Sequence, residues 1–184
     1  MTDIDALLRS TGALMEGHFK LASGRHSGTY IEKFRIMEDP VATASMCSMI
    51  AEHFRNAGAR VVAGPAMGGV ILAFETAKHM GLHSIFAEKG GGGRLYFDRG
   101  FALEPAQPVL VVDDVLTTGG SVKQMLDLVR DAGAKVMGVG FLIDRTNGGV
   151  DFGVPLYACH SMNIESFAAD ECPLCRQGLP LVET

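Results

Sequence analysis

The chain of 184 residues is 47% hydrophobic and 20% charged, a composition typical of globular proteins that excludes a disordered chain. Its formal net charge of −5 argues against non-specific binding to nucleic acid, because such binding needs a basic surface. Apolar runs are short, and the first residues are acidic where a signal peptide is basic, so we expect a cytoplasmic protein without a membrane partner.

The N-terminal part of the chain has one helical pattern. Ile4, Leu7 and Leu8 have helical spacing, and Gly12 marks a stop after them. Residues 14–34 carry several glycines among polar side chains, which predicts loops or short strands.

From residue 41 onward, helical and apolar segments alternate. Helices are predicted over residues 41–57, 69–80 and 121–131. Strands are predicted over residues 60–63, 83–87, 109–112 and 136–143. The strands are continuously apolar, which indicates an α/β fold whose mainly parallel central sheet is flanked by helices. In such sheets, ligands bind beyond the carboxyl ends of the strands.

The segment after the strand 109–112 combines acidic, hydroxyl and glycine residues. Asp113 and Asp114 are followed by a Thr-Thr-Gly-Gly-Ser run (117–121), with Ser121 as the expected helix cap. Backbone N–H groups at a helix N-terminus bind anions, most naturally a phosphate. The two carboxylates cannot face the same anion, so sugar hydroxyls or Mg²⁺ are their expected partners. The alternative is an ordinary capped turn with solvated acids.

Four blocks of sequence resemble one family. Residues 111–121 closely resemble the phosphoribosyl-pyrophosphate (PRPP) motif of type I phosphoribosyltransferases. Residues 21–30, which contain Ser-Gly-Arg, are similar to the N-terminal signature of orotate phosphoribosyltransferases, and residues 64–69 resemble that family's pyrophosphate loop. Arg145 stands where the family places the arginine that holds the orotate carboxylate.

The resemblance implies a fold, a reaction and a division of the chain. It implies a type I phosphoribosyltransferase domain over residues 1–184, with the N-terminal helix and a small hood in 1–35, the core in 41–145 and a C-terminal segment in 146–184. It also implies transfer of the phosphoribosyl group of PRPP to orotate, giving orotidine 5′-monophosphate and pyrophosphate in pyrimidine biosynthesis. An acceptor other than orotate, or a non-catalytic PRPP-sensing domain, is the alternative.

The resemblance also assigns roles to residues. PRPP binding falls to Lys89, Asp113, Asp114, Val115, Leu116, Thr117, Thr118, Gly119, Gly120 and Ser121. Pyrophosphate is approached by Gly64, Pro65, Ala66, Met67, Gly68 and Gly69. Orotate binding falls to Tyr30, Thr117 and Arg145, and catalysis to Lys89, Asp113 and Asp114. Mg²⁺ is the implied cofactor, contacted indirectly by the two aspartates.

Residues 88–100 are the expected lid of the site. Four consecutive glycines predict flexibility, and Lys89, Arg94 and Arg99 are the cations of this segment. The resemblance implies a homodimer in which the lid reaches the neighbouring subunit. The lid has no histidine, unlike the best-known form of the family, and is closer to a shorter-lidded bacterial branch. A disordered hairpin with solvated charges is the alternative.

The cysteines allow several interpretations. Cys172 and Cys175 have metal-ligand spacing, and with Cys159 and His160 they could form a zinc site of three thiolates and one imidazole. Reduced structural thiols are the first interpretation, and zinc or redox chemistry the alternatives. His18 is expected to be a surface or structural residue, whereas His26 could lie near substrate.

Overall fold

The computed structural model describes residues 3–146 and 148–184, which form two compact units. The larger unit is Pro40–Met162, and the smaller combines the residues up to Asp39 with Asn163–Thr184. The predicted α/β core lies in the larger unit. The single domain over residues 1–184 stays a prediction.

The larger unit is built on a mainly parallel sheet, as predicted. Across the described residues its order is β5-β4-β3-β6-β7-β8, with β5 antiparallel to β4 and the other neighbours parallel. The strands are β3 (Val61–Pro65), β4 (His83–Lys89), β5 (Leu95–Phe97), β6 (Pro108–Leu116), β7 (Lys135–Asp144) and β8 (Leu156–Ser161). The sequence pattern did not reveal β5, which has three residues, or β8, whose residues are mostly half-buried.

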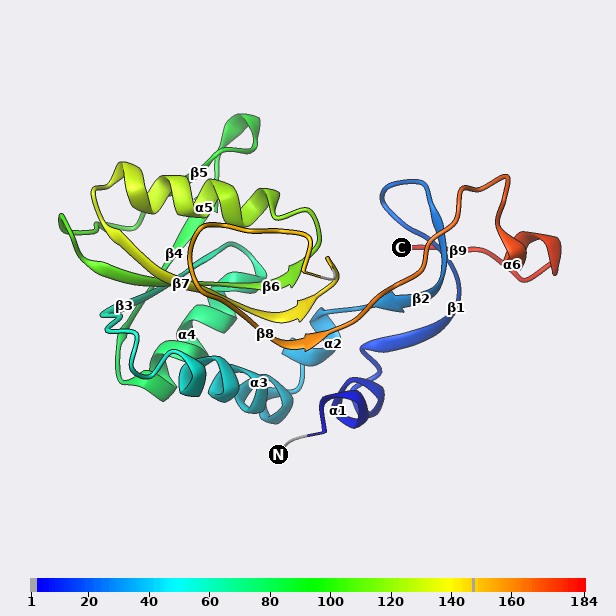
Figure 1. Ribbon diagram of the computed structural model, residues 1–184, viewed down its shortest axis with the longest axis horizontal. Helices are drawn as coiled ribbons and strands as arrows, with labels where there is room; N and C mark the ends of the chain where they lie inside the picture. The colour runs from blue at the N-terminus through cyan, green and yellow to red at the C-terminus, as the bar shows by residue number, and fades with distance from the viewer. Residues whose placement is uncertain (1–2, 147) are drawn as a thin grey trace. The chain divides into compact units, whose positions relative to one another are not determined.

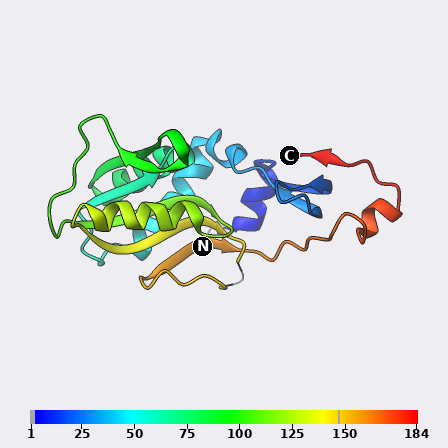
Figure 2. The same ribbon diagram turned by 90° about the horizontal axis from the view of Figure 1, so that it is seen from above.

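Helices cover both faces of this sheet, which explains its continuously apolar strands. They are α3 (Pro40–His53), α4 (Gly68–Met80) and α5 (Gly120–Asp131). Figure 1 shows α3 and α4 on one side of the sheet and α5 on the other, and Figure 2 shows α5 running along the sheet. Val109 and Val111 join the core cluster that includes Val122 and Met125 of α5. The intervening Leu110 is also fully buried, so β6 is covered on both faces.

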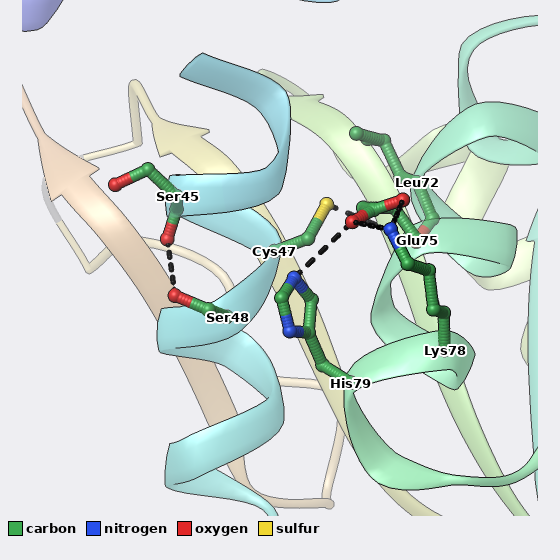
Figure 3. Close-up of polar contacts among 7 residues, drawn as sticks. All are labelled: Ser45, Cys47, Ser48, Leu72, Glu75, Lys78 and His79. Atoms are coloured by element: carbon green, nitrogen blue, oxygen red, sulfur yellow. Dashed lines mark hydrogen bonds and ion pairs between the residues drawn. The ribbon is translucent and has the colours of Figure 1, made fainter. Parts of the chain in front are cut away.

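The interface of α3 and α4 holds a buried thiol (Figure 3). Cys47 is fully buried, as expected for a core residue, and its Sγ donates to the Leu72 carbonyl oxygen at 3.9 Å. Burial raises the pKa of the Cys47 thiol to about 11. Nearby, the Glu75 carboxylate accepts from Lys78 Nζ at 3.1 Å and lies 3.2 Å from His79 Nε2. Cys47 is therefore held as a neutral thiol at ordinary pH.

The smaller unit joins N-terminal and C-terminal segments. Its elements are α1 (Ile4–Ser10), β1 (Leu14–Lys20), β2 (His26–Ile31), α2 (Phe34–Met37), α6 (Pro173–Arg176) and β9 (Val182–Glu183). The strand β1 pairs antiparallel with β2 and parallel with β9. The predicted helix and short strands are present, but the N-terminal hairpin is completed by C-terminal residues. No helix among the described residues is long and apolar enough to cross a membrane.

Candidate functional site

Three predicted binding loops leave the sheet at one edge. The strands β3, β4 and β6 are parallel neighbours, so their carboxyl ends lie together. The loop 64–69 follows β3, the predicted lid follows β4, and the acidic and glycine-rich segment ends β6. Strand topology thus brings together segments that are far apart in the sequence.

The loop after β6, residues 117–121, has the backbone geometry of an anion cradle, and we call it the anion cradle. Gly119 adopts a left-handed conformation with φ 75°, and α5 begins at Gly120 without a side-chain cap. The first-turn N–H groups of an α-helix lack intrahelical partners and carry the positive end of the helix dipole. Thr117 and Thr118 are exposed beside them. This geometry suits the phosphate predicted for the loop.

Ser121 does not cap the helix, contrary to the sequence-based expectation. The left-handed Gly119 starts α5 before Ser121, which therefore lies inside the first turn. Its Oγ instead donates to Asp113 Oδ2 at 2.9 Å. Ser121 thus fixes the orientation of a strand-end carboxylate.

The neighbours of Gly119 leave no room for a side chain at this position. A Cβ atom at this position would lie 2.9 Å from Phe152 Cζ and 3.3 Å from Val150 Cγ1. Both neighbours belong to the segment between β7 and β8, in which the sequence analysis identified only Arg145 as a site residue. The shape of the anion cradle therefore depends on Val150 and Phe152, and only their packing could have revealed this.

Asp113 and Asp114 lie within β6, near its carboxyl end, and are only 7% and 6% exposed. The Asp114 N–H donates to Asp113 Oδ1 at 2.9 Å, and the Val115 N–H donates to Asp114 Oδ1 at 2.7 Å. Backbone donors thus orient both carboxylates. The result is two buried, hydrogen-bonded acids close in sequence to the start of α5.

Arg145 follows the neighbouring strand β7. Asp144 pairs with Leu116 of β6, and the Arg145 N–H donates to the Leu116 carbonyl oxygen at 2.9 Å. The Asp144 carboxylate is buried and accepts from both Thr146 N and Thr146 Oγ1 at 2.7 Å. This turn holds the backbone of Arg145 beside the end of β6.

The loop after β3 is compact because two glycines touch. A Cβ atom on Gly64 would overlap the carbonyl oxygen of Gly69, and one on Gly69 would lie 2.7 Å from Pro65 Cδ. The Ala66–Met67 peptide bond is cis, and the Ala66 N–H donates to the Ala87 carbonyl oxygen of β4. The backbone of this loop can approach a ligand closely.

The predicted lid forms a hairpin at the sheet edge. Glu88 of β4 pairs with Tyr96 of β5, and the 3-10 turn Gly91–Gly93 joins the strands. Arg99 Nε donates to Glu88 Oε1 at 2.8 Å, and this bond raises the pKa of the Arg99 guanidinium. Lys89 and Arg94 are exposed, and Lys89 forms no ion pair among residues 3–146 and 148–184. The glycines thus form a defined turn, while lid movement stays a prediction.

Tyr30 belongs to the smaller unit, on β2. Its ring centroid lies 5.6 Å from that of Phe19, and both residues line a cavity of about 630 Å³. Residues of α1 and β9 complete the walls of this cavity. A contact of Tyr30 with orotate stays a prediction.

The structure separates the cysteines that the sequence grouped together. Cys159 is on β8 of the larger unit, where its Sγ donates to the Met46 carbonyl oxygen and burial raises its pKa to about 12. Cys172 and Cys175 are in the smaller unit, close to His18 and His26. Cys159 is therefore not part of the cluster, and two histidines that sequence spacing did not connect take part instead.

The sequence and the structure of this chain are similar to those of known phosphoribosyltransferases. The family model described as "Phosphoribosyl transferase domain" matches residues 38–170. An orotate phosphoribosyltransferase of Chlorobium phaeobacteroides is 46% identical over 175 residues, which cover 95% of this chain and 90% of the relative. One of Thermotoga maritima is 43% identical over 177 residues, covering 96% and 94%. The crystal structure of orotate phosphoribosyltransferase from Aeropyrum pernix matches with a TM-score of 0.75 at 28% identity, covering 86% and 93%.

Proposed function

The chain belongs to the phosphoribosyl transferase family and, within it, to the orotate phosphoribosyltransferases, and we propose that it transfers the phosphoribosyl group of PRPP to orotate. An orotate ring nitrogen forms the new bond to the anomeric carbon of the ribose while the bond to the pyrophosphate oxygen breaks. The products are orotidine 5′-monophosphate and pyrophosphate. This reaction belongs to the synthesis of pyrimidine nucleotides.

One juxtaposition carries the proposal. The anion cradle, the two hydrogen-bonded acids and Arg145 lie at the carboxyl ends of the neighbouring strands β6 and β7. A phosphate, a diol and a carboxylate are the groups that these three features suit. PRPP and orotate together present all three.

PRPP binding uses the backbone more than side chains. The N–H groups of residues 117–121 receive the 5′-phosphate at the start of α5. Asp113 and Asp114 accept hydrogen bonds from the ribose hydroxyls, since ionised carboxylates are strong acceptors. The backbone of residues 64–69 approaches the pyrophosphate, which the contact of Gly64 with Gly69 makes possible.

Mg²⁺ fits the donor set at this edge of the sheet. It commonly keeps several waters and binds through one or two carboxylates together with substrate phosphates. Asp113 and Asp114 are oriented carboxylates near the anion cradle and would hold the ion through water. When bound, Mg²⁺ supplies positive charge to the pyrophosphate group.

Arg145 is the residue proposed to select orotate. Its guanidinium presents paired N–H donors, whose fork geometry matches a carboxylate. Uracil and hypoxanthine lack this carboxylate and would not accept these paired hydrogen bonds. Thr117 and Tyr30 complete the predicted orotate contacts.

Lys89 is the proposed catalytic cation. Negative charge grows on the departing pyrophosphate, and a cation placed there stabilises the transition state. Arg99 is held by Glu88, whereas Lys89 stands at the start of the hairpin turn without an ion pair among the described residues. Closure of the lid would also exclude water from the reacting carbon.

We further propose a cytoplasmic homodimer in which the lid serves the neighbouring subunit's site. The hairpin 88–100 supports this arrangement, because its cations Lys89, Arg94 and Arg99 are exposed at the sheet edge. The net charge of −5 supports a small-molecule enzyme that binds neither nucleic acid nor membrane.

The test is consumption of orotate, followed by absorbance, with PRPP and Mg²⁺. Hypoxanthine and uracil are the parallel acceptors. Turnover of orotate alone supports the proposal, whereas silence with orotate and turnover of another base overturns it. PRPP binding without turnover of any base would instead indicate a sensor.

Arg145→Ala tests the selection of orotate. We expect kcat/KM for orotate to fall about 10- to 100-fold, because a charge-assisted hydrogen-bond pair is removed. The matched control is Arg55→Ala, which removes an exposed arginine of the same unit that pairs only with Glu52 among the described residues. Unchanged orotate kinetics in Arg145→Ala would remove the assignment.

A further inference from the structure

The smaller unit gathers four metal-ligating side chains from two distant segments. His18 lies on β1 and His26 on β2. Cys172 directly precedes the one-turn helix α6, and Cys175 lies within it. One ligand atom from each lies within 4.8 Å of every other. His18, His26 and Cys172 are at most 6% exposed, so three of the four ligands are buried.

The distances match the edges of a tetrahedron around one metal ion. Zn–N bonds of about 2.0–2.1 Å and Zn–S bonds of about 2.3 Å give N···S edges of about 3.5 Å and N···N edges of about 3.3 Å. His18 Nε2 lies 3.5 Å from Cys172 Sγ and 3.6 Å from Cys175 Sγ. His26 Nδ1 lies 3.3 Å from Cys175 Sγ and 3.0 Å from His18 Nε2. Only small movements would seat an ion at the centre.

A backbone carbonyl orients the first histidine for this role. His18 Nδ1 lies 2.9 Å from the Leu179 carbonyl oxygen, which can only accept a hydrogen bond. Nδ1 therefore carries the proton, and Nε2 directs its lone pair at the cluster. This arrangement of a ligating imidazole held by an outer carbonyl is usual in zinc sites.

Main-chain pairing builds the rest of the cluster. The β1–β2 register places Lys20 opposite His26, which brings both histidine strands together. His26 and Phe167 exchange N–H···O bonds of 2.9 and 2.8 Å, which bring the C-terminal segment to β2. Pro173 then starts α6, so that Cys172 and Cys175 stand one turn apart. The site is thus prepared by contacts that do not require the metal.

We propose that His18, His26, Cys172 and Cys175 bind one structural zinc ion. Two thiolates and two imidazoles fill a tetrahedral shell, and this leaves no position for water or substrate. The ion would join β1 and β2 to a segment about 150 residues further along the chain. It therefore holds the smaller unit together and takes no part in phosphoribosyl transfer.

Two other uses of these residues have distinct signatures. A Cys172–Cys175 disulfide would lower the intact mass by two hydrogens and abolish metal binding. A two-iron cluster would colour the protein and would place the histidines and cysteines on different irons. The short distances from His18 to both sulfur atoms favour a single shared ion.

The first experiment measures metal in the full-length protein purified without chelators. We expect elemental analysis by inductively coupled plasma mass spectrometry to find about one zinc ion per chain. Replacement by Co²⁺ should give the intense visible bands of a tetrahedral site together with thiolate-to-cobalt charge transfer. Less than stoichiometric zinc after incubation with Zn²⁺, together with octahedral or absent Co²⁺ bands, would overturn the proposal.

Variants then separate the cluster from the other thiols. Cys172→Ser and His18→Ala should lose the bound zinc, whereas Cys159→Ser should keep it, because Cys159 belongs to the larger unit. Equal zinc loss in Cys159→Ser would overturn the ligand set. If the cluster variants do not fold, alkylation of wild-type Cys175 keeps the test open, since this exposed thiol should react slowly with zinc bound and readily after its removal. Alkylation at the same rate in both states would also overturn the proposal.

Discussion

The proposed phosphate-binding site and the histidine–cysteine cluster are assembled in opposite ways. The first lies in the larger unit, where the main ligand groups come from loops at the carboxyl ends of parallel strands. The second lies in the smaller unit, where residues about 150 positions apart meet through a hairpin and a C-terminal segment.

This contrast has a physical basis. A parallel sheet brings its loops to one edge whatever their side chains, and helix N-termini then supply donors for anions. A small unit buries a smaller share of its surface than a large one, so a cross-link contributes more to its stability. The larger unit should therefore tolerate loss of its ligands, while the smaller should depend on its ligand for stability.

The largest expected effect is the removal of zinc. A ligand present at about 1,000 times its Kd stabilises the folded state by about 4 kcal/mol. We expect zinc removal to increase hydrogen exchange in β1, β2 and residues 165–184, with β6 and β7 unchanged. An equal increase of hydrogen exchange in both units would contradict the prediction that zinc stabilises the smaller unit alone. The Mg²⁺ dependence of orotate turnover should be measured by leaving Mg²⁺ out of the assay. A chelator would remove the zinc as well as the Mg²⁺ and would mix the two effects.

The next largest effect is a fall in kcat that leaves the stability of the folded protein unchanged. Lys89→Ala should lower kcat about 100-fold, because it removes a cation from the transition state. The matched variant Arg99→Ala should change kcat less, since Glu88 holds that guanidinium. Both side chains are exposed, so the melting temperature should stay within about 2 °C of wild type. A larger loss in Arg99→Ala would reassign the catalytic cation.

The anion cradle offers a smaller, purely steric test. Gly119→Ala should destabilise the folded protein by about 1–3 kcal/mol, because its φ of 75° and the Phe152 contact both exclude a side chain. Gly120→Ala is the control, because its Cβ would meet only Thr118 Oγ1, at 3.7 Å. Urea unfolding of both variants measures the difference. Equal stability would show that Phe152 moves aside.

The smallest effect is the pH dependence of the α3–α4 interface. Burial raises the pKa of Cys47 from 9.0 to about 11 in the folded protein, so the unfolded chain releases its proton first. Between these values stability falls as pH rises, by about 1 kcal/mol at pH 10 relative to pH 8. Cys47→Ser should flatten this part of the curve of unfolding free energy against pH. An unchanged slope would mean that other groups dominate.

Sequence reasoning succeeded where the signal was local. The apolar run Val109–Val112 predicted a buried strand, and the small residues after it predicted a turn into a helix, both of which the structure has. It failed for β8, because half-buried residues have no clear period. It also misplaced the helix start at Ser121, since a left-handed Gly119 changes which residue caps the helix.

The histidine–cysteine cluster shows most clearly what sequence reasoning could not predict. Cys172 and Cys175 indicated half a site through their spacing, but nothing near them in the chain identified the other half. His18 and His26 have no sequence relation to Cys172, and adjacency alone made Cys159 and His160 look suitable.

The sequence by itself determined the α/β class and the order of the loops along the chain, because hydrophobic period, glycine content and charge act over short distances. Only the tertiary structure decided that Phe152 shapes the cradle, that Asp113 is oriented by Ser121 and that two histidines meet two cysteines. These contacts join residues that strand pairing and packing bring together, and pairing between distant segments leaves no periodic trace in either one.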